Sequence, residues 1–199
     1  MSVLTDFCDK IGAGFDPCAK APGVAGIEPG VYAFNKDEFT LTLSPTNPLI
    51  VTGITRVGDA LMYKIKGFGD SFNAISKPAK KMVGPRYSET VTAYITDNSS
   101  VTKQFVVNAL TGRVCIIVVN NEKSTDGAVE LFGAQNGLQL SDNSQRDAAD
   151  EDMQGGWKLE FINPPKLLEA WPPRCVTLGV TPTYATTIAA LELLTEPAA

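Results

Sequence analysis

The sequence predicts a mainly β domain with flanking helices, an α+β fold in which two packed antiparallel sheets form a sandwich or barrel. The first observation is a run of six apolar, mostly β-branched residues at 114–119, which is typical of a strand buried on both faces. The second is the recurrence of short segments in which apolar and polar residues alternate, most regularly at 157–161. The third is the spacing of apolar residues near 98–111 and 183–195, which predicts two helices.

The chain is long enough for one domain with a sizeable core, since 44% of its 199 residues are apolar. We predict an N-terminal arm at 1–26, followed by a single β-sandwich or β-barrel domain at 27–199. In the arm, residues 2–11 have the spacing of a short helix, and the stretch after them is rich in glycine and proline. The arm has too few apolar residues to fold alone, so it is either disordered in the free subunit or laid along a neighbour.

The first part of the domain has the pattern of successive strands. Turn residues such as Pro45 and Pro48 separate them. In the last of these strands, Val91, Ala93 and Ile95 alternate with polar residues and would share one face. The expected strands are 31–34, 39–43, 50–57, 61–65 and 87–96.

Residues 69–86 interrupt this pattern and are predicted to form a long loop or hairpin arm. The segment has no clear period, and it carries the positive charges of Lys77, Lys80, Lys81 and Arg86. Loops longer than about 12 to 15 residues in compact domains are usually functional or disordered. Two interpretations stay open, a solvated surface loop or a contact with an acidic partner.

The middle of the domain is predicted to run from a helix into the core strand and then into a hairpin. Residues 97–100 offer helix caps, and Gly112 is placed to end the helix. A polar turn region at 120–127 follows the core strand and leads to an alternating strand at 129–132. The apolar residues that repeat along the helix are Val101, Phe105, Val106, Ala109 and Leu110.

The C-terminal part combines turns, an acidic loop, one strand and one helix. Gly133 and Gly137 predict a bend or bulge before the loop. After the strand at 157–161, a last helix is expected to start at 181–182, where a proline stands in the first turn. One face of this helix would carry Tyr184, Ile188, Leu191 and Leu194. The acidic residues of the loop are Asp142, Asp147, Asp150, Glu151 and Asp152.

The residue types exclude most catalytic chemistry, because the chain contains no histidine. Ser-His-Asp and Cys-His machinery is therefore excluded. The glycine patterns of dinucleotide-binding and phosphate-binding loops are also absent from the sequence. We predict no catalytic residue and no cofactor, and we expect that the protein is not an enzyme. An enzyme that uses a lone cysteine or carboxylate stays open as an alternative.

The four cysteines do not have the spacing of a zinc site. Cys115 lies in the predicted core strand, where we expect it as a small core residue. A disulfide between Cys8 and Cys18 is an alternative to two free thiols, although disulfides are uncommon in reducing compartments. The acidic run at 147–152 lacks the glycine and glutamate positions of a calcium loop. No metal site is predicted, and a solvated or partner-facing loop is favoured.

The net charge of −5 arises in the second half of the chain. Residues 1–100 contain 10 acidic and 10 basic residues, whereas residues 101–199 contain 12 acidic and 7 basic residues. Tight binding to DNA or to anionic lipid is therefore not expected. No apolar run approaches the roughly 20 residues of a membrane span, and the first residues lack the pattern of a secretory signal. We expect a cytoplasm-like compartment and no membrane partner.

Several short motifs occur in a characteristic order. A basic connection between two strands precedes a helix that meets the core strand at Gly112-Arg113-Val114, and a Gly137-Leu138 turn follows. The segment 150–156 then precedes a strand, and Tyr-Ala-Thr-Thr-Ile at 184–188 belongs to the closing helix. In this order the chain resembles the tail tube proteins of tailed bacteriophages, most closely those of phages of Bacteroidetes. The needle protein of type VI secretion shares the fold of that family.

This resemblance implies a structural virion protein. A tail tube subunit would be assembled in the host cytoplasm into stacked homohexameric rings, whose channel passes DNA during ejection without tight binding. Its partners would be copies of itself and other phage tail proteins, and the family has no catalytic residues to carry over. Another virion protein, such as a capsid decoration or tail-completion protein, stays open as the alternative, because it would share the β fold without forming tubes.

Two sets of charged residues would serve such an assembly. We hypothesise an interface in which Lys77, Lys80, Lys81 and Arg86 contact Asp147, Asp150, Glu151 and Asp152 of the adjacent subunit. Each exposed pair contributes only about 0 to 1 kcal/mol, so a repeated network is needed. Carboxylates along a channel would repel phosphates, and some of Glu122, Asp126, Glu130, Asp142 and Glu160 are therefore expected to face the lumen. The alternative is that the net charge only keeps the domain soluble.

Overall fold

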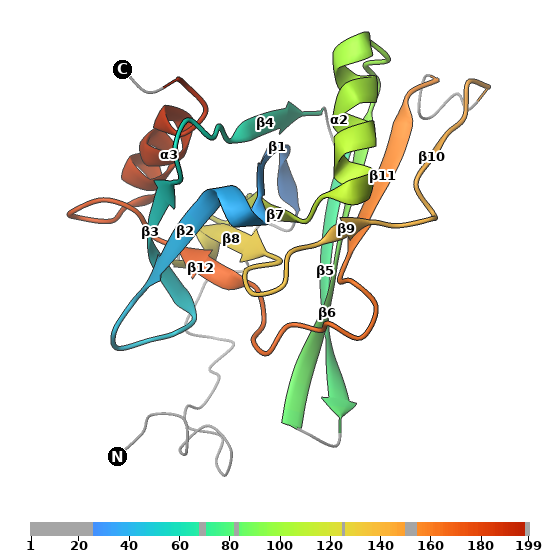
Figure 1. Cartoon of the computed structure of the whole chain (residues 1–199). Helices are drawn as coiled ribbons and strands as arrows, with labels where there is room; N and C mark the ends of the chain where they lie inside the picture. The colour runs from blue at the N-terminus through green and yellow to red at the C-terminus, as the bar shows by residue number, and fades with distance from the viewer. Residues whose placement is uncertain (1–25, 68–70, 82–83, 125, 150–154, 198–199) are drawn as a thin grey trace.

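The computed structural model describes residues 26–67, 71–81, 84–124, 126–149 and 155–197. In these ranges the chain forms two β-sheets and two α-helices (Figure 1). Residues 1–25 of the predicted arm, including Cys8 and Cys18, lie outside them. Asp150, Glu151 and Asp152 of the acidic loop also lie outside the described residues.

The larger sheet, called the seven-stranded sheet below, has the order β2-β3-β12-β8-β7-β1-β4. β12 pairs in parallel with β3, whereas the other pairs of neighbouring described strands in this sheet are antiparallel. Its strands are β1 (Ile27–Asn35), β2 (Phe39–Leu43), β3 (Ile50–Arg56), β4 (Tyr63–Lys66), β7 (Val114–Asn120), β8 (Val129–Phe132) and β12 (Arg174–Val176). Two short 3-10 helices, Lys36–Glu38 and Asp126–Ala128, precede β2 and β8.

The smaller sheet, called the five-stranded sheet, has the order β10-β11-β6-β5, and β9 also pairs with β11. All of these pairs are antiparallel. The strands are β5 (Phe72–Lys81), β6 (Gly84–Ile95), β9 (Gln139–Leu140), β10 (Gln145–Arg146) and β11 (Trp157–Ile162). The two sheets pack as a sandwich and are not closed into a barrel. The predicted mainly β fold with two packed sheets is thus confirmed.

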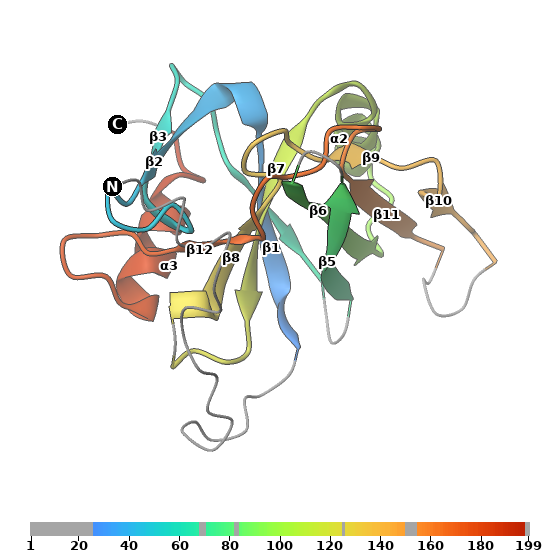
Figure 2. The ribbon, with the colours of Figure 1, turned by 90° about the horizontal axis from the view of Figure 1, so that it is seen from below.

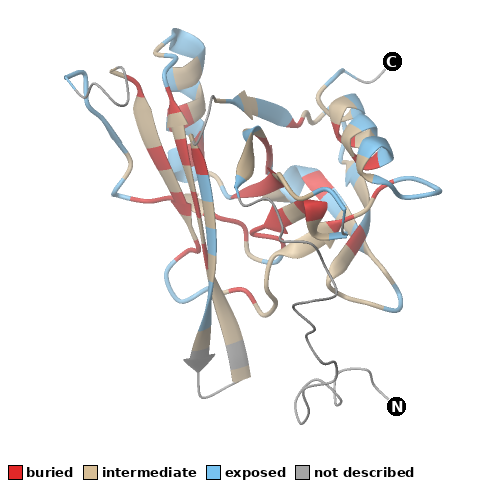
Figure 3. Ribbon diagram, turned by 180° about the vertical axis from the view of Figure 1, so that it is seen from behind, coloured by how far each residue is buried: buried red, intermediate tan, exposed pale blue. Residues whose placement is uncertain are grey.

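The molecule has two apolar cores, one on each face of the seven-stranded sheet (Figure 3). The first core lies between the two sheets and includes Phe132, Phe161 and Leu159. The second core lies between the seven-stranded sheet and the C-terminal helix α3 (Tyr184–Leu193), and it includes Phe34 and Leu131. Figure 2 shows α3 and the five-stranded sheet on opposite sides of β7 and β8.

The apolar run at 114–119 forms β7, and it is buried on both faces as predicted. Val114, Ile116 and Val118 point into the first core. Cys115, Ile117 and Val119 point into the second core. Each buried side chain of this size contributes about 1.5 to 3 kcal/mol of transfer free energy. The strand therefore contributes to the stability of both cores. The expectation that Cys115 is a small core residue is confirmed.

Helix α2 (Ser100–Thr111) begins after Ser99, whose side chain accepts a hydrogen bond from the Thr102 amide, and ends at Gly112. Val106 and Ala109 are buried in the first core, with Phe105 packed against them. The predicted apolar face is wrong at both ends of the helix, where Val101 and Leu110 are 77% and 60% exposed. The first core therefore contacts α2 between Phe105 and Ala109 and leaves Val101 and Leu110 exposed.

Helix α3 begins at Tyr184 and not at 181–182 as predicted, because Thr183 makes the N-cap. A capping box joins Thr183 and Thr186, with backbone-to-hydroxyl distances of 2.8 and 3.2 Å. The predicted apolar face of this helix is confirmed. Leu191 is fully buried in the second core, and Tyr184, Ile188 and Leu194 pack against the same core. In the described ranges, neither α-helix is long and apolar enough to cross a membrane.

The turn predicted at Gly133 and Gly137 forms with positive φ angles of 71° at both residues. The Gly137 amide donates to the Gly133 carbonyl at 2.9 Å, and Leu138 then bonds in both directions with Val114 at 2.7 and 2.8 Å. This turn fastens the start of β7 to the segment that leads into the five-stranded sheet. The long loop or hairpin arm expected at 69–86 is a hairpin, because β5 and β6 pair along their length.

Candidate interaction surface

The β5–β6 hairpin projects away from the two cores (Figure 1). Ten residue pairs join its strands, from Phe72 opposite Ala93 to Lys81 opposite Gly84. At about 3.3 Å per residue, a ribbon of this length reaches about 33 Å. The half that carries Phe72 belongs to the five-stranded sheet, while the other half projects as a two-stranded arm. This arm offers a surface that the described subunit itself does not cover.

β5 is the last strand of the five-stranded sheet, so its outer side has no partner strand among the described residues. Tyr87 exchanges backbone hydrogen bonds with Glu169 at 2.8 and 3.0 Å, on the side of β6 away from β5. Because Pro78 lies opposite Tyr87, the alternation of the ladder points its nitrogen to the free edge. The same alternation directs the backbone N–H and C=O groups of Phe72, Ala74 and Ser76 outward. The free edge can therefore accept another strand up to Pro78.

The face of the five-stranded sheet that points away from the first core, called the outer face, is mainly polar. Leu159 and Phe161 point into the first core, so Lys158 and Glu160 point the other way. The cross-strand register extends this face over β6 and β5, where hydroxyl, amide and basic side chains prevail. The outer face consists of Asn73, Ile75, Lys77, Arg86, Ser88, Thr90, Thr92, Tyr94, Lys158, Glu160 and Ile162.

The hairpin carries the basic residues that the sequence assigns to an interface. Lys77 and Arg86 lie on the outer face, and the backbone of Lys80 and Lys81 belongs to β5. On the acidic side, Asp147 is exposed just after β10, where its carboxylate accepts a hydrogen bond from the Ala149 amide at 2.9 Å. Figure 1 shows β10 and the hairpin tip at opposite ends of the five-stranded sheet. The predicted pairing would therefore have to join two subunits.

The five carboxylates predicted to face a lumen lie on different parts of the molecule. Glu122 and Asp126 belong to the connection between β7 and β8, and Asp142 is exposed between β9 and β10. Glu160 lies on the outer face and accepts a hydrogen bond from Asn143 Nδ2 at 3.0 Å. Glu130 lies on β8 and lines a cavity between the sheets. Within one subunit, the described structure does not gather these groups on one surface.

A buried polar cluster anchors the base of the hairpin to the rest of the fold. Glu89 of β6 is 1% exposed, and its carboxylate accepts a hydrogen bond from the Gly133 amide at 2.7 Å. Its backbone amide donates to Asn163 Oδ1. Glu169, also buried, accepts from the amides of Gln135 and Asn136 at 2.9 and 3.0 Å. The cluster thus ties β6 to the 133–137 turn and to the 163–169 segment.

The electrostatics of this cluster are set by burial. Burial raises the pKa of Glu89 to about 8, although the Gly133 amide opposes the shift. Burial also raises the pKa of Glu169 and lowers that of Arg174, whose charge acts on both carboxyls. At neutral pH Glu89 is therefore mainly protonated, and the cluster holds fewer charges than its residue types suggest.

Sequence reasoning missed this cluster, although one signal for it exists. The alternation that assigns Val91, Ala93 and Ile95 to the core face also assigns Glu89 to that face. A glutamate at a core-facing position predicts a buried carboxyl that needs hydrogen-bond donors. Glu169 has no comparable signal, because it follows the prolines of an irregular segment and meets β6 only through the tertiary fold.

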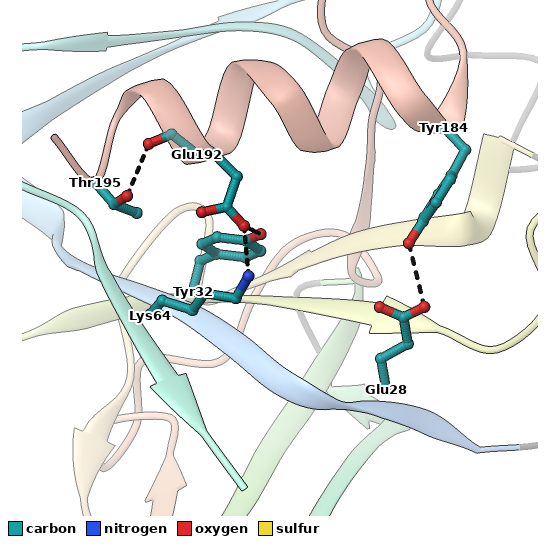
Figure 4. Close-up of polar contacts among 6 residues, drawn as sticks. All are labelled: Glu28, Tyr32, Lys64, Tyr184, Glu192 and Thr195. Atoms are coloured by element: carbon teal, nitrogen blue, oxygen red, sulfur yellow. Dashed lines mark hydrogen bonds and ion pairs between the residues drawn. The ribbon is translucent and has the colours of Figure 1, made fainter.

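Two groups of polar side chains, one at each end, help to hold helix α3 to the seven-stranded sheet (Figure 4), and Arg56 of β3 also donates to the Leu193 carbonyl. At its C-terminal end, the Tyr32 hydroxyl donates to Glu192 Oε1 at 2.6 Å, and Lys64 forms an ion pair with the same oxygen. The Lys64 ammonium also lies 5.2 Å from the centroid of the Tyr32 ring. Lys64 and then Tyr32 lower the pKa of Glu192, so this carboxylate stays ionised at neutral pH.

The N-terminal end of α3 repeats the same three residue types. The Tyr184 hydroxyl donates to Glu28 Oε1 at 3.2 Å, and Lys123 forms an ion pair with Glu28. The Lys123 ammonium lies 4.7 Å from the centroid of the Tyr184 ring. Both contacts are partly exposed, and they orient the helix over the second core. Each tyrosine hydroxyl and each carboxylate in these contacts has a hydrogen-bond or ion-pair partner, so the contacts are explained by their role in holding the helix.

The described residues offer little further chemistry. Among them, no group of three or more His, Cys, Asp or Glu side chains is placed to hold a metal ion. Burial raises the pKa of the Cys115 thiol to about 12, and it also raises the pKa of Cys175. Both thiols are therefore protonated at neutral pH, and the reactive thiolate form is disfavoured. Comparisons of the chain with protein-family models, curated proteins and solved structures found no match.

Proposed function

We propose that this protein is a structural subunit that assembles with copies of itself into stacked hexameric rings, as the tail tube subunit of a tailed bacteriophage. In this proposal it is assembled in the host cytoplasm and functions in the virion tail. Its partners are further copies and other tail proteins, and DNA passes through the channel without tight binding. A capsid decoration or tail-completion protein is the second candidate.

The observation that carries the proposal is the β5–β6 hairpin with its free edge. The projecting half of this hairpin has no buried side chain among its described residues, so an isolated subunit gains little stability from it. The backbone groups that face outward from Phe72, Ala74 and Ser76 can bond to a strand of another subunit. The outer face beside this edge carries three basic residues against one carboxylate, so it suits contact with an acidic surface of another subunit.

The position of the charges supports contacts between subunits. Lys77 and Arg86 lie on the projecting arm, whereas Asp147 lies at the other end of the same sheet. In a ring or stack, the arm of one subunit would reach the acidic loop of the next. The lumen assignment of Glu122, Asp126, Glu130, Asp142 and Glu160 remains a prediction for the assembled state.

The test is assembly of the purified protein, followed by light scattering and negative-stain electron microscopy. We expect rings or tubes from the unmodified chain. The variant Lys77→Glu should shift assembly to higher protein concentration, because repeated arm contacts lose their charge complementarity. Lys103→Glu is the matched control, since Lys103 is equally exposed but lies on α2. A protein that stays a single subunit at every concentration and salt tested would contradict the proposal.

A charge exchange tests the partner of the arm within the same experiment. Lys80→Glu combined with Lys81→Glu should weaken assembly, and adding Asp150→Lys with Asp152→Lys should restore it. Restoration would identify the acidic loop as the partner. Assembly that ignores the first pair of changes would exclude the charged contact while leaving the edge of β5 as the remaining interface.

A further inference from the structure

A cavity of about 250 Å³ lies between the two sheets at the end where β1 begins. Its walls come from the starts of β1 and β5 and from residues of β7 and β8, and Figure 2 shows the starts of β1 and β5 on the same side of the sandwich. Pockets for drug-sized ligands usually measure about 300 to 1,000 Å³. This cavity is smaller, so it suits one head group with a short chain.

The cavity contains a carboxylate that hydrogen bonds orient and that has no salt-bridge partner among the described residues. Asn120 Nδ2 donates to Glu130 Oε2 at 2.9 Å and to the Gly127 carbonyl at 2.8 Å, which fixes the carboxylate. Glu130 Oε1 accepts no hydrogen bond from the described residues. The salt bridges among the described residues join Lys64 to Glu192 and Lys123 to Glu28, so neither of them includes Glu130.

The remaining walls favour an organic cation over an anion or a bare metal ion. Phe72 and Phe132 belong to the cavity wall but are buried, so the lining that a ligand meets is mainly polar. Asp126 lies close enough to act, together with Glu130, on the thiol of Cys175, so the local charge is negative. An anion would be repelled, and a single carboxylate with amides is a poor ligand set for a metal ion.

We propose that this cavity binds an alkylammonium or guanidinium group, with the cationic head at Glu130. Two sources carry this chemistry. One is a free aliphatic diamine, and the other is a lysine or arginine side chain of a second copy of this chain. Only the second source rests on the proposed self-assembly.

The binding test is isothermal titration calorimetry with putrescine and agmatine, at a protein concentration where light scattering detects single subunits. Both probes should bind with one site per chain, whereas uncharged 1,4-butanediol should not bind. Glu130→Gln keeps the shape and the contact to Asn120 but removes the charge, so affinity should fall about tenfold or more. Glu160→Gln is the matched control and should bind like the unmodified chain. Glu160 is also a half-buried strand carboxylate bonded to an asparagine amide, but it lies on the outer face.

A second variant tests the cavity without changing charge. Ala74→Leu places a larger side chain in the wall formed by β5 and should abolish binding of both probes. Circular dichroism and urea unfolding show whether the Ala74→Leu variant folds. If this variant does not fold, the binding measured for Glu130→Gln tests the proposal by itself. The proposal is overturned if the unmodified chain binds neither probe, or if Glu130→Gln binds them as tightly as the unmodified chain does.

The source of the cation is separated by adding putrescine to the assembled protein. If a basic side chain of a second copy fills the cavity, putrescine should dissociate the assembly and Glu130→Gln should assemble poorly. If a free diamine is the ligand, neither change should alter assembly. A protein that binds putrescine but never assembles would contradict the proposed function and retain the cavity as a cation site.

Discussion

At the scale of single residues, the buried carboxyl of Glu89 makes folding stability depend on pH. Burial raises its pKa from 4.5 to about 8 in the folded protein, so the folded chain keeps a proton that the unfolded chain releases. The contribution of this proton to the free energy of unfolding is fully present below pH 4.5 and is lost as pH rises through about 8. Within this window, one proton changes the free energy of unfolding by up to ~1.4 kcal/mol per pH unit.

Glu89→Gln should remove this dependence, because the amide has the shape of the protonated carboxyl and does not ionise. We expect a flatter profile of unfolding free energy between pH 5 and 8, and a variant more stable than the unmodified chain at pH 8. Urea unfolding at several pH values measures both. Glu169 titrates in both proteins, so the difference between the two profiles isolates Glu89. Parallel profiles would show that Glu89 is already ionised in the folded state.

Gly137 shows how backbone conformation and packing add at one position. Its φ is +71°, and a Cβ there would lie 2.8 Å from the Cβ of Arg113. Gly58 has a similar φ of +65°, but a Cβ there meets nothing within 4 Å. Gly58→Ala should therefore cost only the left-handed backbone term of about 1 to 2 kcal/mol. Gly137→Ala should cost more, about 3 kcal/mol or above, since the clash adds to that term. Equal losses in denaturant unfolding would mean that the turn shifts freely.

At the scale of elements, α3 is held mainly by apolar packing and secondarily by its two polar contacts. Leu191 is fully buried in the second core, while Leu193, two positions on, is 67% exposed. Leu191→Ala should lower the free energy of unfolding by about 2 to 5 kcal/mol. Leu193→Ala is the control and should change it by less than about 0.5 kcal/mol. A similar loss in both variants would indicate that the outer side of α3 is covered, for example by another subunit.

Strands with a regular apolar pattern were predictable, whereas the far half of β5 was not. In β11, Leu159 and Phe161 alternate with polar residues because only one side of the strand meets a core. The far half of β5 has no core on either side, so its sequence shows no alternation and resembles a loop. Pro78 also suggests a break, yet it is tolerated because its nitrogen points to the free edge. A local sequence pattern therefore does not reveal a strand that forms only through backbone pairing with its neighbour, here β6.

At the scale of the whole molecule, the chain's charge pattern predicted the basic arm but not the features that surround it. The positive residues from 77 to 86 do lie on a projecting element. The cavity at Glu130 could not be predicted, because its walls come from the starts of β1 and β5 and from β7 and β8, which are distant in sequence. Glu130 has the same spacing as any solvated strand residue, and only the packing of two sheets gives it an enclosed position.

The place of β12 in the seven-stranded sheet bears on the order in which the protein folds. This three-residue strand lies between β3 and β8, and among the described strands it is the one that joins the β2–β3 pair to the rest of that sheet. During synthesis, β2 and β3 emerge early but must wait for more than a hundred further residues before their neighbour exists. Long-range pairing of this kind makes folding slow, because the entropy cost of closing the long loop comes before the stabilising contacts form. The second core can therefore close only after β12 has been synthesised, which leaves the apolar side chains of β2 and β3 without their neighbour until then.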